Sequence, residues 1–232
     1  VRNNSILYYS IVMAMVVFSV AFFRSDDFMP LLRNWQAKKY LDQSKGYRDI
    51  GILRSDHLEE EDATKTAEKA YLLAPADMAI ARNLAEVYFE VNPVQGLTQW
   101  EIVVNMPGVT LEDRIHVVGL ALKAAAETHA RSRNRILASD RNRIYFLAIA
   151  RRQLELLSRH DRFSQRSEFL MALAEFSAES GDLRTALNTI VRLRSEIEDP
   201  DPKLDLLFCR IAIHAKHPQL LDKAVGLLSK LA

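Results

Sequence analysis

The chain has 232 residues, of which 49% are hydrophobic, and its formal net charge at pH 7 is +1. A single cysteine excludes an intrachain disulfide and a cysteine-based zinc site, and the near-neutral charge creates no overall field that would attract nucleic acid. Glycine and proline number seven each, and no long alternation of apolar and polar residues indicates a sheet. The sequence therefore predicts an all-α protein with a buried core.

The first predicted element is an uncharged apolar stretch at residues 6–23. As a helix it would extend ~27 Å, which is enough to cross the hydrocarbon core of a bilayer. Aromatic residues at both of its ends suit the membrane interfaces, so we predict a single transmembrane anchor within residues 1–30. Ser19-Val20-Ala21 also fits a signal-peptide cleavage site, and a buried core helix is a third alternative.

This anchor predicts a single-pass membrane protein, with the bacterial inner membrane as its expected location. One basic residue precedes the stretch and four follow it before residue 40, so the positive-inside rule places the following domain in the cytoplasm. Export of that domain is the alternative, because long domains cross membranes largely regardless of their charge. The sequence leaves the side of the membrane open.

The next predicted element is a long juxtamembrane helix over residues 31–57. Its rough apolar stripe includes Leu32, Trp35 and Leu41. An acidic run follows at residues 59–62, where the positive end of a helix dipole favours carboxylates. We interpret this run as the beginning of another helix and not as a binding patch.

Small residues then recur at helical spacing, as Ala63, Ala67 and Ala70, and Pro75 ends this predicted helix. A second helix follows with the pattern Leu84-Ala85-x-x-Tyr88, in which a large residue precedes a small one and an aromatic one comes a turn later. Two antiparallel helices can lie close together only where the facing side chains are small. The two patterns therefore predict a closely packed helix pair.

The pattern resembles the tetratricopeptide repeat, a helix–turn–helix unit of about 34 residues that stacks into an α-solenoid. A matching pair at Val117-Val118 follows Leu84 by close to one such period, and the pairs Leu173-Ala174 and Leu207-Phe208 are one full period apart. The resemblance implies that a tetratricopeptide-like α-solenoid of antiparallel helix pairs occupies residues 58–232.

The spacing between these pairs is irregular in the middle of the chain. The pair at residue 173 follows the pair at residue 117 by much more than one period, so we predict an irregular segment at about residues 124–165. We expect an enlarged connection at residues 131–140 to account for it. Cap signals mark several other boundaries: Asp77 before one helix, Thr110-x-x-Asp113 before the next, and Gly181 at a tight turn.

In the tetratricopeptide family, the first helices of successive repeats line a groove that binds extended peptides or partner helices. The resemblance therefore implies a scaffold for protein–protein interaction whose ligand is a protein or a peptide. A permanent structural subunit of an envelope or secretion assembly, with an exported repeat domain, is the alternative. The repeat positions predict these groove residues: Arg82, Asn83, Glu86, Phe89, Met171, Glu175 and Glu179.

A basic stretch lies between residues 131 and 166, with ten arginines against three acidic residues. One interpretation is a solvated face whose counter-charges come from glutamates of the following helix. The other is a binding site for acidic protein segments, anionic lipid headgroups or nucleic acid phosphates. Nucleic acid is the least favoured of these, because the anchor confines the domain and stacking aromatic residues are scarce. The candidate patch consists of Arg141, Arg143, Arg151, Arg152, Arg159, Arg162 and Arg166.

Motifs of catalysis are absent from the sequence, which has no phosphate-binding glycine loop, nucleophile elbow or zinc-protease motif. His214-x-x-His217 has the spacing of metal ligands, but His217 precedes Pro218 at a predicted turn, so we expect a surface pair. Cys209 lies among apolar residues and is expected to be a packed, inert thiol. We therefore predict a binding protein without catalytic residues, metal or cofactor.

Overall fold

The computed structural model describes Met13, Met15, Val16 and residues 28–54, 57–131, 136–196, 202–215 and 218–231. These residues form helices joined by turns, with no strand among them, which confirms the all-α prediction. The chain divides into two compact units, residues 1–99 and 100–232. The predicted domain limits at residues 30 and 57 stay a prediction.

The prediction of a transmembrane helix is wrong for the part of the chain that the structure describes. No helix among these residues is long and apolar enough to cross a membrane. The 27-residue α2 (Phe28–Arg54) carries charged side chains along its length, and these would be costly to bury in hydrocarbon. Residues 6–23, on which the prediction rested, lie outside the described residues except for three methionine and valine positions. The predicted single-pass location in the bacterial inner membrane depended on that helix and is corrected with it.

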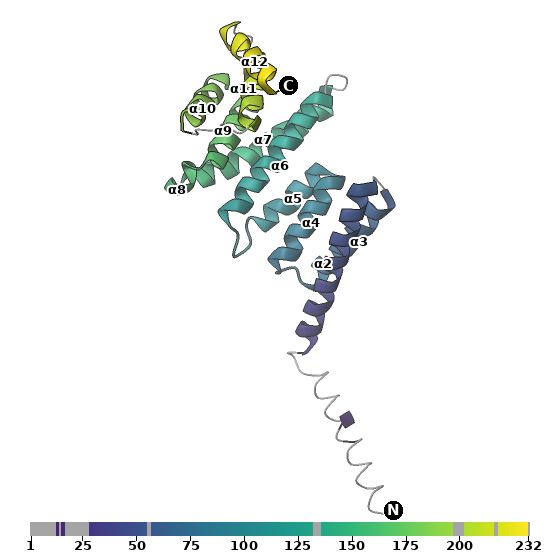
Figure 1. Cartoon of the computed structure of the whole chain (residues 1–232). Coiled ribbons are helices and arrows are strands. Elements are labelled where there is room, and N and C mark those ends of the chain that lie inside the picture. The colour runs from purple at the N-terminus through teal and green to yellow at the C-terminus, as the bar shows by residue number, and fades with distance from the viewer. Residues whose placement is uncertain are drawn as a thin grey trace, which may run out of the picture. The chain divides into compact units, whose positions relative to one another are not determined.

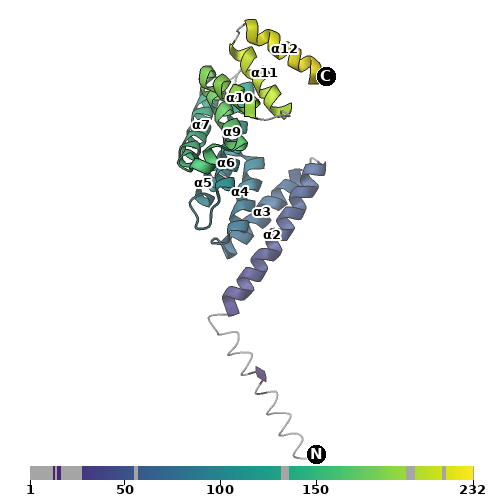
Figure 2. The ribbon, with the colours of Figure 1, turned by 60° about the vertical axis from the view of Figure 1, so that its left-hand side comes forward.

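The first unit contains α2, α3 (His57–Leu73), α4 (Met78–Val91) and the beginning of α5 (Pro93–Val103). Helices α2 and α3 lie side by side and antiparallel, and α4 packs against both (Figure 1; Figure 2). Alanines of α3 form the contact: Ala70 packs with apolar residues of α2, and Ala63 and Ala67 pack with Leu84 of α4. The predicted small-residue stripe therefore lies buried between helices, as close packing requires.

Helix α4 begins at the predicted cap. The side chain of Asp77 accepts hydrogen bonds from the backbone N–H groups of Ala79 and Ile80, at 2.9 Å and 3.3 Å. At the other end a single residue separates α4 from α5, and the two helices meet at Gly96. A Cβ atom at Gly96 would overlap the backbone of Phe89, so only glycine permits this approach.

The second unit contains the end of α5 and the helices that follow it. In chain order these are α6 (Leu111–Arg131), α7 (Ile136–Ser158), α8 (Asp161–Ser164), α9 (Ser167–Ser180), α10 (Leu183–Glu196), α11 (Pro202–Ala215) and α12 (Pro218–Leu231). Three pairs are antiparallel: α6 with α7, α9 with α10, and α11 with α12 (Figure 1; Figure 2). Helix α9 also packs on α6 and α7, and α11 packs on α10. This unit therefore has the helix pairs that the tetratricopeptide resemblance implies.

Two predicted cap signals in this unit are confirmed. The side chains of Thr110 and Asp113 form a reciprocal capping box, in which the N–H of Asp113 donates to Thr110 Oγ1 and the N–H of Thr110 donates to Asp113 Oδ2. Gly181 ends α9 with a φ of 89°, a left-handed conformation that favours glycine.

The predicted enlarged connection at residues 131–140 is wrong. Helix α6 extends to Arg131 and α7 begins at Ile136, so little chain separates them. The longer spacing comes instead from helices of 21 and 23 residues, compared with 14 residues in α9, and from the short α8. Leu137 and Ala138 are good helix formers, which agrees with a helix that already begins at Ile136, where a loop was expected.

Candidate functional site

The predicted groove residues of the first unit lie on α4 and are only partly at the surface. Asn83 is 5% exposed and Phe89 7% exposed, whereas Arg82 and Glu86 are half-buried. The Asn83 side-chain amide donates a hydrogen bond to Ser44 Oγ at 3.0 Å, and that hydroxyl donates to the backbone carbonyl of Ala63 at 3.0 Å. Asn83 thus ties α4 to α2 and α3 and does not present its amide to a ligand.

Replacing Asn83 by alanine is expected to lower the free energy of unfolding by about 1 kcal/mol, because a buried hydrogen bond is lost. Urea denaturation followed by far-UV circular dichroism measures the change. Asn188→Ala is the matched control, since the same change at an exposed position of α10 should leave stability within about 0.5 kcal/mol. Equal stability of Asn83→Ala and wild type would contradict the role of this bond.

The predicted groove residues of the second unit lie on α9. Met171 and Glu175 are half-buried, and Glu175 has an interaction partner. Glu179 forms ion pairs with Arg143 of α7 at 3.8 Å and with Arg210 of α11 at 3.4 Å. Its carboxylate is therefore occupied by two arginines of the same unit. Because the two predicted groups belong to different units, neither unit brings all seven residues together.

The arginine patch has partners for four of its seven members. Besides the pair with Glu179, Arg151 meets Glu155 at 2.9 Å, Arg152 meets Glu101 at 3.3 Å, and Arg166 meets Glu112 at 3.1 Å. The counter-charges thus come from four different helices, and only Glu179 is among the glutamates of α9 that the sequence predicted as counter-charges. The remaining three are exposed and form no ion pair with another described residue: Arg141, Arg159 and Arg162.

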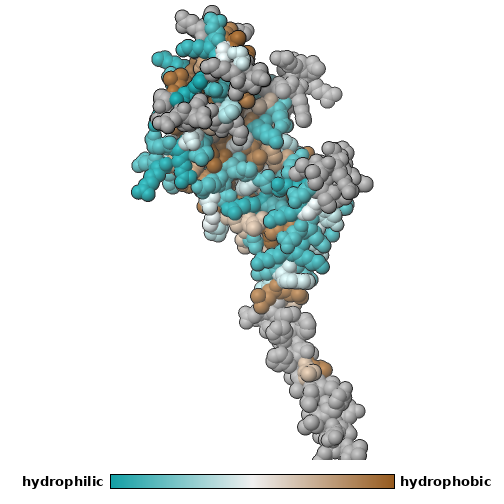
Figure 3. Space-filling model, in the orientation of Figure 1, coloured by the Kyte–Doolittle hydropathy of each residue, from teal (hydrophilic) through white to brown (hydrophobic). Residues whose placement is uncertain are grey.

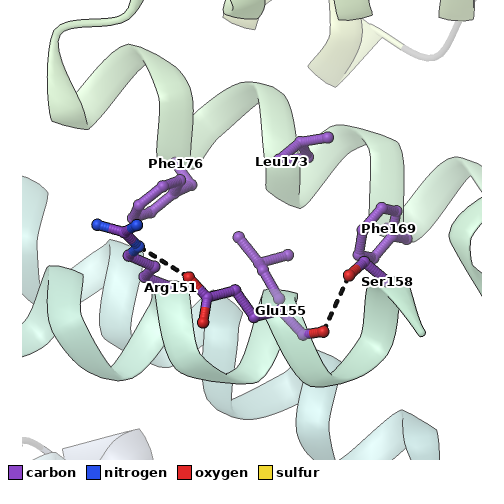
Figure 4. Close-up of a pocket in the computed structure, with 7 residues that line it drawn as sticks. Arg151, Glu155, Ser158, Phe169, Leu173 and Phe176 are labelled. Carbon is purple, nitrogen blue, oxygen red and sulfur yellow. Dashed lines mark hydrogen bonds and ion pairs between the residues drawn. The ribbon is translucent and has the colours of Figure 1, made fainter.

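A pocket of about 290 Å³ lies between α7 and α9 (Figure 4). Its walls are apolar, with Leu154 from α7 and Phe169, Leu173 and Phe176 from α9. Its rim is polar and comes from α7, where the Arg151–Glu155 ion pair and the Ser158 hydroxyl lie. Figure 4 shows the Phe176 ring beside the Arg151 guanidinium at one end and Phe169 beside Ser158 at the other.

Leu173 shows that this pocket departs from the repeat pattern. The same repeat position is held by Leu84, Val117 and Leu207, which are 3%, 0% and 5% exposed. Leu173 is only half-buried, although its spacing predicts a core residue like the others. Leu173 follows the longer α7 and the short α8 in the chain. Neighbouring helices cover its face of α9 only in part.

The pocket is lined by a different face of α9 from the one that the repeat positions predict for a groove, and that groove stays a prediction. Met171 and Glu175 were taken from the repeat positions, whereas the pocket is lined by residues spaced four and three apart, Phe169, Leu173 and Phe176. This spacing places all three on one stripe of the helix. The stripe is visible in the sequence, but buried and exposed stripes have the same pattern, so only the structure distinguishes them.

A second apolar surface lies at the beginning of α2, where Figure 3 shows brown surface on an otherwise mostly hydrophilic face. Met29, Leu31 and Trp35 are 45%, 65% and 61% exposed, and the Lys39 ammonium lies 5.8 Å from the centre of the Trp35 ring. The shallow pocket beside Trp35 is lined by residues of α2 alone. One helix face without a second wall forms a weaker site than the α7–α9 pocket.

The residues that could take part in redox or metal chemistry are Cys209 and the pair His214 and His217. Cys209 is buried, its thiol donates to the carbonyl of Ala224 at 3.5 Å, and burial raises the pKa of that thiol. The structure thus confirms a packed thiol. His217 and the side chain of His214 lie outside the described residues. Within the described residues, no group of three or more histidine, cysteine, aspartate or glutamate side chains is arranged to hold a metal ion.

No protein-family model matches the chain, and no curated protein sequence matches it. Two solved structures are similar to it. PilF of Pseudomonas aeruginosa has a TM-score of 0.35 and 15% sequence identity, with 86% of this chain and 93% of that chain covered. PilW, described as a widely conserved type IV pilus biogenesis factor, has a TM-score of 0.35 and 14% identity, with 81% and 91% covered.

Proposed function

We propose that this protein is a protein-interaction module and that it binds an apolar side chain of a partner protein in the pocket between α7 and α9. The observation that carries the proposal is the exposure of Leu173 at a repeat position that is buried in the other repeats. Partly exposed Leu173 and Phe176 form an apolar surface that a partner would cover, and burial of apolar surface drives association.

The size of the pocket favours a side chain over a small-molecule ligand. Sites for small molecules usually have volumes of about 300–1,000 Å³, and this pocket lies at the lower limit of that range. Its polar groups favour binding over catalysis. Arg151 and Glu155 neutralise each other, and the Ser158 hydroxyl donates to the carbonyl of Glu155 in its own helix. These groups do not converge as an acid, a base and a nucleophile would.

Replacing Leu173 by glutamate is expected to weaken peptide binding by at least about tenfold, because a carboxylate in the pocket would lose its hydration on binding. Peptides are first selected from a random phage library on the immobilised wild-type chain. The affinity of each selected peptide for wild type and Leu173→Glu is then measured by fluorescence anisotropy.

Val191→Glu is the matched control, because Val191 is 60% exposed on α10 and does not line the pocket. We expect it to bind the selected peptides as wild type does. Ser158→Trp is a second test that leaves the apolar walls unchanged and fills the pocket from its exposed rim. If the peptides bind both pocket variants as tightly as wild type, or if no peptide is selected, the proposal is wrong.

A further inference from the structure

We propose that the partner segment bound at the α7–α9 pocket is acidic, with one large apolar side chain flanked by carboxylates. This inference rests on the proposed function and specifies the chemistry of its ligand.

The outward face of α7 continues the apolar pocket and adds positive charge beside it. Ile144 is 68% exposed and precedes Arg151 by seven residues, as Arg151 precedes Ser158, so all three lie in one row along the helix. A second row lies about 100° further around the helix, at spacings of eleven and seven residues, and its Arg152 is paired with Glu101: Arg141, Arg152 and Arg159. A segment that lies along this face therefore meets apolar side chains and guanidinium groups together.

The charges on α7 are mostly positive, and two of the arginines there have no counter-charge within the described part of the chain. Between residues 140 and 159 the helix and its end carry five arginines against two acidic residues. Arg141 and Arg159 have no ion-pair partner among the described residues. The Arg151–Glu155 pair joins side chains that are 72% and 60% exposed, and such pairs are weak in water. A ligand carboxylate can therefore replace Glu155 at little cost.

The opposite wall of the pocket is acidic, but its carboxylates are largely occupied. Helix α9 carries three glutamates and no basic residue. Glu179 is paired with Arg143 and Arg210, and Glu175 has a partner as well. Only Glu168 is exposed without a described ion pair, and it lies at the first turn of α9. The α7 side therefore carries more unpaired charge, on Arg141 and Arg159, than the α9 side, where only Glu168 is unpaired among the described residues.

These observations select an acidic ligand. Its large apolar side chain would enter between Leu154, Leu173 and Phe176, and its carboxylates would lie over α7. Arginine suits this role because its planar guanidinium can donate two parallel hydrogen bonds to one carboxylate. Arg151 stands at the rim of the pocket, beside the Phe176 ring, and is the arginine that an anchored ligand would meet first (Figure 4).

Defined peptides of about twelve residues test the inference, since a segment of that length spans the pocket and the neighbouring turns of α7. Four fluorescein-labelled peptides are compared by anisotropy: phenylalanine flanked by glutamates, by glutamines or by lysines, and a glutamate peptide with alanine in place of phenylalanine. We expect the glutamate–phenylalanine peptide to bind about tenfold tighter than its glutamine counterpart at ~50 mM salt, with a smaller difference at ~300 mM. The lysine and alanine peptides should bind weakest.

Arg151→Glu should reduce binding of the glutamate–phenylalanine peptide by about tenfold and leave binding of the glutamine peptide nearly unchanged. Arg184→Glu is the matched control, because Arg184 is exposed on α10, away from the pocket, and should bind all peptides as wild type does. Both variants change exposed residues, and circular dichroism verifies that each is folded.

The outcomes separate this inference from the proposed function. If the glutamate and glutamine peptides bind equally and both lose affinity for Leu173→Glu, the pocket binds apolar side chains but the acidic preference is wrong. If no peptide binds, the proposed function fails as well. A thymidine oligonucleotide serves as the competitor from another class. If it binds as tightly as the acidic peptide and Arg151→Glu weakens it equally, the arginines form a nucleic-acid site and the inference is overturned.

Discussion

Replacing Gly96 by alanine is expected to lower the free energy of unfolding by about 2–3 kcal/mol, the largest effect that we predict for a single substitution. The added Cβ would overlap the backbone nitrogen and Cα of Phe89. Backbone atoms cannot rotate away as a side-chain end can, so α4 and α5 would have to separate. Urea denaturation followed by far-UV circular dichroism measures the loss.

Gly46→Ala is the matched control for this prediction. Gly46 lies in α2 of the same unit, and no atom lies within 4 Å of a Cβ built there. Alanine is the better helix former, so this variant should be more stable than wild type by about 0.5–1 kcal/mol. Opposite signs for the same substitution would show that close approach of α4 and α5, and not helix propensity, requires glycine at position 96. A stabilising Gly96→Ala would contradict the contact.

Glu179→Gln is expected to lower the free energy of unfolding by about 2 kcal/mol, because removing one partner of a shielded ion pair leaves the other charge uncompensated. The substitution keeps the shape of the side chain and removes the charge that pairs with Arg143 and Arg210. Glu179 is only 14% exposed, so the partly buried Arg143 loses its counter-charge. Because Arg210 is 43% exposed, water screens its share of the loss, and the full penalty of a buried pair is not expected.

The matched control is Glu155→Gln, the same change in an arginine pair that is exposed on α7. We expect a loss of at most about 0.5 kcal/mol there, and salt should abolish it. The loss at Glu179 should persist in salt, because that carboxylate is shielded from solvent. Equal losses at the two positions would mean that the three helices α7, α9 and α11 are not joined through Glu179.

Much of the fold could be predicted because its signals are local. The alanine stripe of α3, the cap at Asp77 and the glycine turn after α9 each depend on residues within one or two turns of the chain. Small side chains permit close packing, and a left-handed turn favours glycine, whatever the rest of the chain does. The repeat period of about 34 residues then predicts the paired helices.

The candidate site could be predicted much less well, because its signals are distant in sequence. Asn83 occupies a groove position of the repeat, but Ser44, 39 residues earlier, meets its amide and buries it. The counter-charges of Arg152 and Arg166 lie 51 and 54 residues away in the chain. No local sequence pattern predicts that the helices carrying them pack near these arginines. The segment on which the predicted membrane helix rested lies almost wholly outside the described residues, and no helix among the described residues is long and apolar enough to cross a membrane.

The sequence by itself determined the helical class of this protein, the helix pairs, several helix boundaries and the stripes of small residues where helices meet. These features follow from backbone propensity and side-chain size within one repeat. The tertiary structure alone decided which apolar stripe stays exposed and which arginines have no ion-pair partner. Leu173 has the sequence pattern of a core residue, and Arg141 resembles the other arginines of α7. Burial and charge neutralisation depend on side chains that distant helices bring into contact, and these contacts leave the α7–α9 pocket partly open and Arg141 and Arg159 without an ion pair among the described residues.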